Sequence, residues 1–272
     1  MRQVVTGIIG ISLLILASAS LSGCVEVNVG FEPRDYTLRP SEVPPSGAEC
    51  ALSGLVNRRQ NTDAWCWAAS SQMVMEYLNN IASPQLPPLP KSLGTENGQC
   101  QLVNAIFDTD LRHREINTDL SLSCCKADRI TNPHPDNNDP NVTESRNICF
   151  QNRWPDDVFN HPDYHHEFTP VPYSDFQFDR YSHHFAIERL TWQKLKDEIC
   201  QNRPFIFVVQ WSGGGRHTSV VGGYRELPNV GEFVEVHDHL YTDDDFFVMP
   251  YWAFLGVPGD FTHDLDYVNI HR

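Results

Sequence analysis

Residues 60–70 read QNTDAWCWAAS. They lead into residues 64–80, which are apolar at nearly every position except Ser70, Ser71, Gln72 and Glu76. Because these polar residues do not form one stripe, the segment predicts a helix that is buried on most sides. We expect Asp63 to cap this helix, which places Cys66 in its first turn.

The position of Cys66 favours an ionised thiol. Unpaired N–H groups and the positive end of the helix dipole stabilise a thiolate in the first turn. With an imidazolium nearby, a thiol pKa can fall from about 8.5 to ~3.5, and the thiolate is then a nucleophile at neutral pH. The alternative interpretation of an isolated cysteine is a buried core residue or one half of a disulfide.

Three further residues favour the nucleophile. His217 follows a glycine-rich turn and directly precedes residues 218–224, which read TSVVGGY, so it lies at the mouth of a predicted strand. Asp238 ends the next predicted strand, where a carboxylate can orient an imidazole. Gln60 lies six residues before Cys66, close enough for its amide to face the same reacting centre.

These residues resemble the motifs of papain-like cysteine peptidases, specifically the secreted and effector-type bacterial branch with a Gln-x5-Cys-Trp-Ala-Ala signature. The resemblance implies an α+β fold, with a helical half that holds the nucleophile helix and an antiparallel sheet or partial barrel. It implies that Cys66 is the nucleophile, His217 the general base and acid, and Asp238 the residue that orients His217. Gln60 and the backbone N–H of Cys66 would form the oxyanion hole.

Some assignments have competitors. Asp243, Asp244 and Asp245 are alternative carboxylates, although they are more typical of a solvated turn. Trp65 and Trp67 flank the thiol and are candidates for the substrate groove, with core packing as the alternative for both.

The implied activity is hydrolysis of peptide bonds in a protein or peptide substrate, without a cofactor. One alternative is a cysteine amidase or endopeptidase acting on peptidoglycan, although such enzymes usually lack a glutamine six residues before the nucleophile. The other is an inactive binding module with the same fold.

Local patterns predict further elements. Residues 190–202 predict a helix that Thr191 caps and Arg203-Pro204 ends. Short β-branched or aromatic runs predict four strands at residues 205–211, 218–224, 233–236 and 246–251. Residues 81–189 are rich in Pro, Asn, Asp and His, and we expect a long loop or insertion with one helix at residues 99–107. Helices followed by strands indicate an α+β domain.

The N-terminus is typical of a bacterial lipoprotein. Residues 1–23 carry one charge and a short apolar run, as in a secretory signal, and Leu21-Ser22-Gly23-Cys24 resembles a lipobox. The resemblance implies export with a lipid anchor at Cys24, in the outer membrane if the cell is Gram-negative. An unlipidated export signal and a membrane-spanning anchor are the alternatives. Residues 24–49 predict a tether or extended arm, and residues 50–272 the peptidase domain.

Cysteine, histidine and charge complete the expectations. With Cys24 lipidated and Cys66 reduced, six cysteines are disulfide candidates: Cys50, Cys100, Cys124, Cys125, Cys149 and Cys200. The 12 histidines show no convincing ligand spacing, so we expect no metal site. A net charge of -15 without a Lys/Arg block argues against nucleic-acid binding. We expect a monomer.

Overall fold

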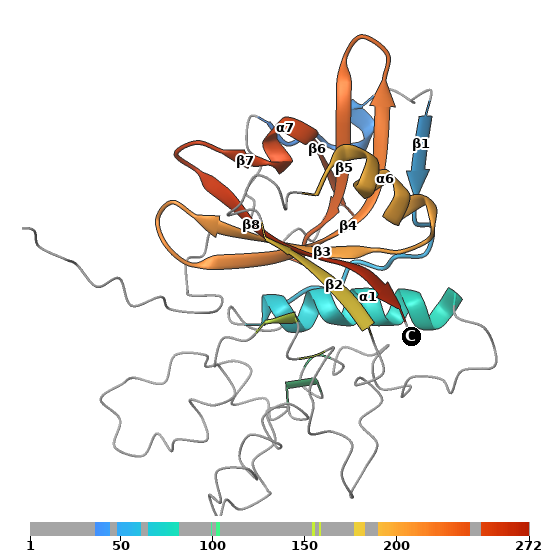
Figure 1. Ribbon diagram of the computed structural model, residues 1–272, viewed down its shortest axis with the longest axis vertical. Helices are drawn as coiled ribbons and strands as arrows, with labels where there is room; N and C mark the ends of the chain where they lie inside the picture. Colours follow the sequence, from blue (N-terminus) through green and yellow to red (C-terminus); the bar gives the residue numbers. More distant parts are fainter. Residues whose placement is uncertain are drawn as a thin grey trace, which may run out of the picture.

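The computed structural model describes residues 36–43, 48–60, 65–81, 99, 102–103, 154–155, 158, 177–182, 190–239 and 246–271. They form an α+β structure in which helices pack on a curled antiparallel sheet (Figure 1). The elements in chain order are η1 (Pro40–Glu42), β1 (Ala48–Ala51), α1 (Cys66–Ile81), β2 (Gln177–Ser182), α6 (Trp192–Cys200), β3 (Phe205–Trp211), β4 (Arg216–Leu227), β5 (Gly231–His237), β6 (Phe247–Pro250), α7 (Tyr251–Phe254), β7 (Gly256–Val257) and β8 (Phe261–His271).

The sheet has the strand order β2-β8-β3-β4-β5-β6, and all its pairings are antiparallel. Strand β4 changes partner along its length, because its first half pairs with β3 and its second half with β1. A register shift interrupts its pairing with β5 between Val221 and Gly223. Such bulges bend a strand and increase its twist, in keeping with the curl of the sheet at this strand.

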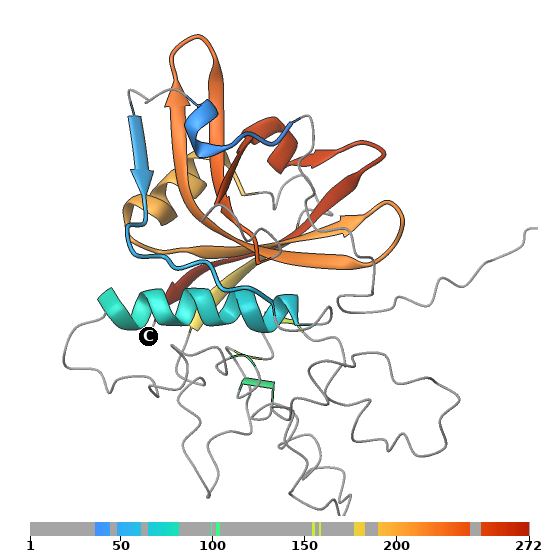
Figure 2. The same cartoon turned by 180° about the vertical axis from the view of Figure 1, so that it is seen from behind.

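Helix α1 packs against β4 and β3. In both views it lies below the central strands, while α6 and α7 lie above them (Figures 1 and 2). Every residue from Cys66 to Met75 is buried, which confirms the prediction of a helix buried on most sides. The hydrophobic core therefore lies between α1 and the sheet, and it continues on the inner side of the curled sheet.

The predicted elements of the C-terminal half are largely confirmed. Strand β3 has the predicted bounds, β4 and β5 are longer than predicted, and β6 ends earlier because Tyr251 starts α7. Helix α6 begins after Thr191, whose side chain accepts a hydrogen bond from the backbone N–H of Lys194 at 3.2 Å. Of the predicted helix 99–107, the described residues 99, 102 and 103 are helical.

Strand β8 was not predicted, although it lies between β2 and β3. It carries His263, Asp264 and Asp266, which are all buried. Polar residues of this kind do not indicate a central strand unless their partners are known. Strand β2 lies within the region 81–189 that we expected to be a loop or insertion, and it pairs with the C-terminal part of β8.

The segment expected to be a tether or arm joins the domain in its described part. Leu38 and Val248 exchange two backbone hydrogen bonds of 2.7 and 2.9 Å, and Val43 is buried. Ala48 and Glu49 already belong to β1. Residues 36–43 are therefore a packed arm, and the domain includes residues before the predicted boundary at residue 50.

Two N-terminal predictions lie outside the described residues, namely the signal segment 1–23 and lipidation of Cys24. Among the described residues, no helix has the length and apolar character needed to span a bilayer.

Candidate active site

Helix α1 places Cys66 at its first residue. The carbonyl of Trp65 accepts the hydrogen bond from Ala69 N at 2.9 Å, so the helical ladder starts immediately before Cys66. The prediction that Cys66 lies in the first turn is confirmed, whereas the predicted cap, Asp63, lies outside the described residues. Cys66 is 1% exposed.

The sulfur of Cys66 is part of a disulfide bond. Because Cys50 and Cys200 are bonded to each other, the partner of Cys66 is not among the described residues. The expectation of a reduced thiol at Cys66 is therefore wrong for this structure. A disulfide sulfur is not a thiolate, and the thiolate is the nucleophilic form.

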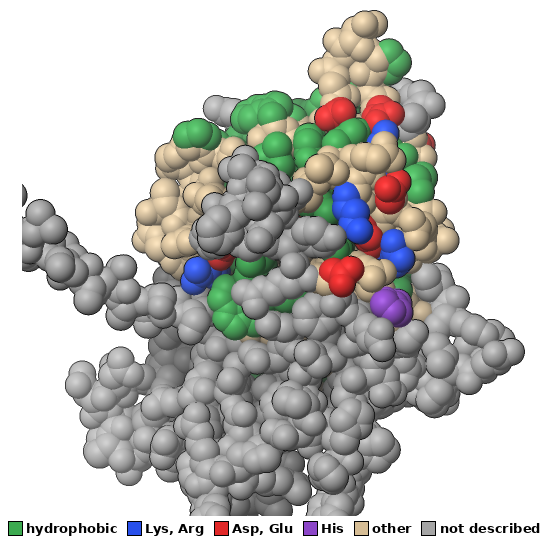
Figure 3. Space-filling view, viewed as in Figure 1, with side chains coloured by type: hydrophobic (Ala, Val, Ile, Leu, Met, Phe, Trp, Pro, Cys, Tyr) green, Lys and Arg blue, Asp and Glu red, His purple; other side chains and the backbone are tan. Residues whose placement is uncertain are grey.

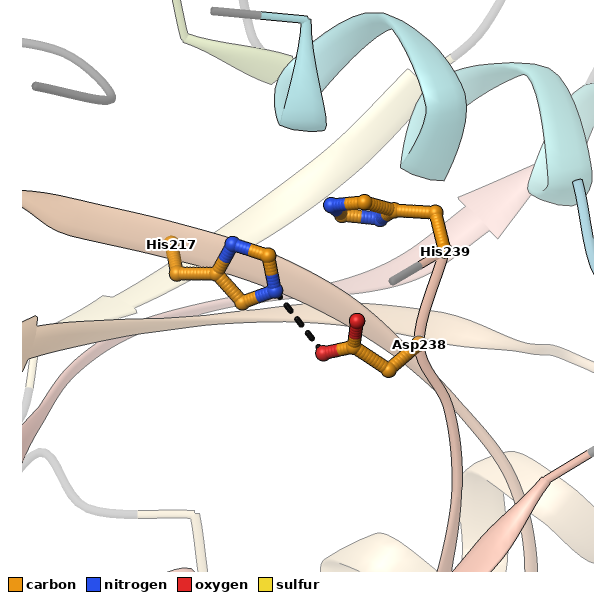
Figure 4. Close-up of side chains that lie close together, drawn as sticks. All are labelled: His217, Asp238 and His239. Atoms are coloured by element: carbon orange, nitrogen blue, oxygen red, sulfur yellow. Dashed lines mark hydrogen bonds and ion pairs between the residues drawn. The ribbon is translucent and has the colours of Figure 1, made fainter. Parts of the chain in front are cut away.

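His217 and Asp238 form a buried pair at the ends of neighbouring strands. His217 is the second residue of β4, and Asp238 directly follows β5. Nε2 of His217 donates to Oδ2 of Asp238 at 2.8 Å (Figure 4), and Ser219 Oγ donates to the same oxygen at 2.6 Å. Asp238 is fully buried, while His217 is 6% exposed. The sequence prediction paired these two residues, and the structure brings them together.

The hydrogen bond to Asp238 sets the orientation of the imidazole. Since Nε2 is held by the carboxylate, Nδ1 is the ring nitrogen that is directed to other groups. In Figure 4, Nδ1 faces the side of the site along which α1 passes. The arrangement suits a histidine that exchanges a proton through Nδ1 with a group on the helix side.

A buried contact docks α1 on β4 next to His217. Ser70 Oγ lies 3.1 Å from both the carbonyl oxygen and Oγ1 of Thr218. Ser70 is one helical turn after Cys66 and therefore lies on the same helix face, and Thr218 directly follows His217. The turn that begins with Cys66 is thus held against the start of the strand that carries His217.

Gln60 reaches this region on residues 55–60, a segment without regular secondary structure that follows a turn at residues 52–55. Asn57 Nδ2 donates to the carbonyl of Asp238 at 3.0 Å, and Gln60 N donates to the carbonyl of His239 at 3.2 Å. Gly222 lets the segment approach β4, because a Cβ at this position would lie 2.6 Å from Leu55 Cδ2. The backbone of Gln60 therefore lies beside the residues that follow β5.

The site favours a charged carboxylate beside a neutral second imidazole. Burial alone would raise the pKa of Asp238, but His217, His239 and the hydrogen bonds from His217 and Ser219 hold the pKa well below its usual range. Burial lowers the pKa of His239 to about 3, against the opposing effect of Asp238. At neutral pH, Asp238 can thus stabilise positive charge on His217 while His239 stays neutral.

A second buried pair, His263 and Asp266, looks similar but differs in its contacts. Nε2 of His263 lies 2.9 Å from Asp266 Oδ1, and Nδ1 lies 2.8 Å from the carbonyl oxygen of Phe254. Both ring nitrogens of His263 are used in internal hydrogen bonds, and its side chain is fully buried. This pair therefore serves the packing of β8 against α7, and no sequence signal distinguished it from the candidate pair His217–Asp238.

The remaining candidates fall into two groups. Trp65 and Trp67 are both 0% exposed and belong to the hydrophobic core, so neither lines an accessible groove in this structure, and the core alternative is correct. The other group lies outside the described residues and consists of the disulfide candidates Cys100, Cys124, Cys125 and Cys149 and the competing carboxylates Asp243, Asp244 and Asp245. Sequence reasoning placed His239 near enough to shape the site, but it did not identify Ser219 or Ser70 as parts of it.

Comparison with known proteins adds no assignment. No protein-family model matches the chain, and no curated protein matches it significantly.

Proposed function

We propose that this protein is a papain-like cysteine peptidase that hydrolyses peptide bonds of a protein or peptide substrate. The observation that carries the proposal is the buried His217–Asp238 pair at 2.8 Å, adjacent to the Ser70–Thr218 contact that docks the Cys66 turn. A helix that begins with cysteine, opposite an imidazole oriented by a carboxylate, has the components of a thiol nucleophile and its base.

Each residue has a distinct role in the proposed reaction. The Cys66 thiolate attacks the substrate carbonyl carbon, and Gln60 with the Cys66 backbone N–H stabilises the oxyanion. The C–N bond breaks as His217 gives a proton to the leaving amine, which leaves a thioester on Cys66. His217 then takes a proton from water, the resulting hydroxide displaces the thiolate, and the carboxylic acid product departs. Asp238 stabilises the imidazolium in both steps.

The proposed activity belongs to the reduced protein, because Cys66 is disulfide-bonded in the structure. Thiol–disulfide exchange with an external thiol would free the Cys66 sulfur and transfer the bond to that thiol. The active form would then contain the thiolate at the N-terminus of α1.

Three sequence-based assignments complete the proposal. The chain would be exported, anchored to the bacterial membrane by a lipid on Cys24, and monomeric, with its domain outside the cytoplasm. The net charge of -15 supports a protein that avoids nucleic acids and other anionic surfaces.

Hydrolysis and thiol labelling test the proposal together. After reduction, we expect the wild-type protein to cleave casein and to react with an active-site-directed epoxide at Cys66, as mapped by peptide mass spectrometry. Cys66→Ala should abolish both, and Gln60→Ala should lower kcat/KM by about 10²–10³. Near-UV circular dichroism checks that each variant is folded. Hydrolysis that survives in Cys66→Ala would overturn the proposal.

A second candidate is a binding module with the same fold and no activity. The observation that favours it is the disulfide bond of Cys66, which removes the nucleophile from the described form. If the reduced, folded protein neither labels at Cys66 nor hydrolyses casein, this candidate replaces the peptidase. Release of fragments from muropeptides, without casein cleavage, would identify a peptidoglycan amidase or endopeptidase instead.

A further inference from the structure

Three potential metal ligands converge at the His217 end of the site. One ligating atom each from His217, Asp238 and His239 lies within 4.8 Å of the other two, and all three residues are buried. The rings of His217 and His239 have centroids 4.6 Å apart (Figure 4). Two imidazoles and a carboxylate are a donor set that zinc and other divalent transition metals bind.

His239 provides an independent indication of a ligand. Its side chain is 0% exposed, and neither ring nitrogen has a hydrogen-bond partner. Leaving a buried polar group unpaired is destabilising, and an apolar side chain would avoid this cost. The main chain of His239 has its own contact, because its carbonyl accepts the hydrogen bond from Gln60 N. That contact explains the backbone position but does not require an imidazole.

We propose that His217, Asp238 and His239 bind one divalent transition-metal ion, with Zn²⁺ as the preferred ion. Zinc–nitrogen and zinc–oxygen bonds of about 2.0–2.2 Å place tetrahedral ligand atoms ~3.3–3.5 Å apart. Binding therefore requires His239 to move toward the His217–Asp238 pair, while the 2.8 Å separation within that pair lengthens to admit the ion. The ion would take the place of the proton on Nε2 of His217, and the neutral imidazole would carry its proton on Nδ1 instead.

The expected consequence is reversible inhibition, a part of the inference that rests on the proposed function. The ion would occupy the two residues that the peptidase needs for proton transfer. Zinc would then act as an inhibitor, and a chelator would restore activity. Metal binding itself requires no peptidase activity and can be measured separately.

Calorimetric titration of Zn²⁺ into the metal-stripped, unreduced wild-type protein measures the binding directly. Without reductant, the disulfide of Cys66 prevents its sulfur from competing for the ion. We expect one tight site, whose affinity falls by at least about tenfold in His239→Gln and in Asp238→Asn. His271→Gln is the matched control, because His271 lies at the end of β8 with its Nδ1 hydrogen-bonded to the Asn269 carbonyl. This variant should retain the site.

Co²⁺ provides a second readout, since a tetrahedral site with nitrogen ligands gives a visible absorption band that His239→Gln should remove. Thermal unfolding of each variant confirms that it is folded. If His239→Gln does not fold, Asp238→Asn still tests the site, because asparagine has nearly the same shape as aspartate. Equal zinc affinity and stoichiometry in wild type and both variants would overturn the metal site. Wild-type protein that binds no zinc would overturn it as well.

The two proposals can fail independently. If the reduced protein binds zinc tightly but shows no hydrolysis, the proposed metal site is supported and the proposed peptidase activity is rejected. If the protein hydrolyses its substrate, zinc does not inhibit it and no zinc binding is detected, the proposed peptidase activity is supported and the proposed metal site is rejected. If both hold, zinc should inhibit the wild type, and a larger zinc concentration should be needed to inhibit His239→Gln to half of its own activity.

Discussion

Asp238 accepts hydrogen bonds from His217 and Ser219 on the same carboxylate oxygen, at 2.8 and 2.6 Å. It is buried completely, and its carbonyl also accepts a hydrogen bond from Asn57. One side chain thus orients the imidazole, while the main chain of the same residue holds the segment that leads to Gln60. At the residue scale, the candidate site depends on Asp238 for both orientation and assembly.

We expect Asp238→Ala to lower kcat/KM of the reduced protein by about 100-fold or more, because His217 loses both its orientation and the negative charge that stabilises its imidazolium. The free energy of unfolding should fall by about 1–3 kcal/mol, since buried donors lose their acceptor. Steady-state hydrolysis and denaturant titration measure the two effects.

The matched control is Asp266→Ala, which breaks the other buried His–Asp pair. It should cost comparable stability but leave kcat/KM of the folded fraction nearly unchanged. If both variants lose activity equally, the His217–Asp238 pair has no special role in the reaction.

Residue types alone identified most of this site. Cys66, His217, Asp238 and Gln60 were all named from motifs, and the structure brings His217 and Asp238 into direct contact. The proximity of His239 to Asp238 in sequence placed it near the site, but its contact with His217 could not be predicted, because the two rings lie 4.6 Å apart across 22 positions of the chain. The disulfide state of Cys66 likewise depends on a partner that spacing does not indicate.

At the scale of elements, α1 docks on β4 through a contact one turn after Cys66 and one residue after His217. The Ser70 hydroxyl makes a polar contact with Thr218 within an otherwise apolar interface. Side chains in such an interface set the position of a helix along a strand. Small shifts at this contact would therefore change the distance between Cys66 and His217.

Ser70→Ala should lower the free energy of unfolding by about 1–3 kcal/mol, because the buried carbonyl oxygen and Oγ1 of Thr218 each lose a hydrogen-bond partner. Because misplacing reacting groups by about 1 Å can cost ~10² in rate, we also expect a fall in kcat of about 10–100-fold. Chemical denaturation and single-turnover kinetics of the reduced protein test these expectations.

The adjacent residue provides a sensitive control. Ser71 is also buried on α1, but its Oγ has no hydrogen-bond partner. Ser71→Ala removes an unsatisfied hydroxyl, so stability should stay the same or increase, and kcat should not change. Equal losses in the two alanine variants would show that the Ser70–Thr218 contact does not align the site.

Elements with a strong local pattern were predictable, and elements defined by their neighbours were not. The caps and apolar pattern predicted α1 and α6, and β-branched runs predicted β3 to β6. Strand β8 was missed because acids and a histidine are not typical of a central strand, and the ion-pair partner of Asp264, Arg216 at 2.7 Å, lies 48 positions earlier in the chain. Local sequence carries no information about such partners.

At the scale of the whole molecule, one disulfide joins the two sequence halves of the domain. Cys50 in β1 and Cys200 at the end of α6 are bonded across a separation of 150 residues. This bond was one of the pairings allowed by the six candidate cysteines. Closing a long loop restricts the unfolded chain and thereby favours the folded state.

We expect the double variant Cys50→Ala/Cys200→Ala to lose about 2–5 kcal/mol in free energy of unfolding. Urea titration of the unreduced proteins measures this loss, and mass spectrometry confirms that the Cys66 disulfide is retained. The control is Gly213→Ala on the turn before β4, where an added Cβ meets no atom within 4 Å. Equal unfolding midpoints in the double variant and the wild type would show that the Cys50–Cys200 bond does not stabilise the domain.

The charge of the molecule is organised by local pairs. On the face that carries α6, basic and acidic side chains lie next to one another (Figure 3). Lys196 of α6 forms an ion pair with Glu226 of β4 at 2.7 Å. Exposed pairs of this kind contribute little to stability. The net charge of -15 follows from the composition, but the distribution of charged side chains over the surface depends on the fold.

The sequence by itself determined the α+β class, the two principal helices, four strands and the identities of the proposed nucleophile, base, carboxylate and amide. These features follow from hydrophobic periodicity, capping and motifs, which act over a few residues. Only the tertiary structure decided the place of β8 and β2 in the sheet, the packed arm at residues 36–43, and the burial of Trp65 and Trp67. It also decided the disulfide state of Cys66 and the convergence of His239 on His217 and Asp238, because each of these depends on contacts between residues far apart in the chain.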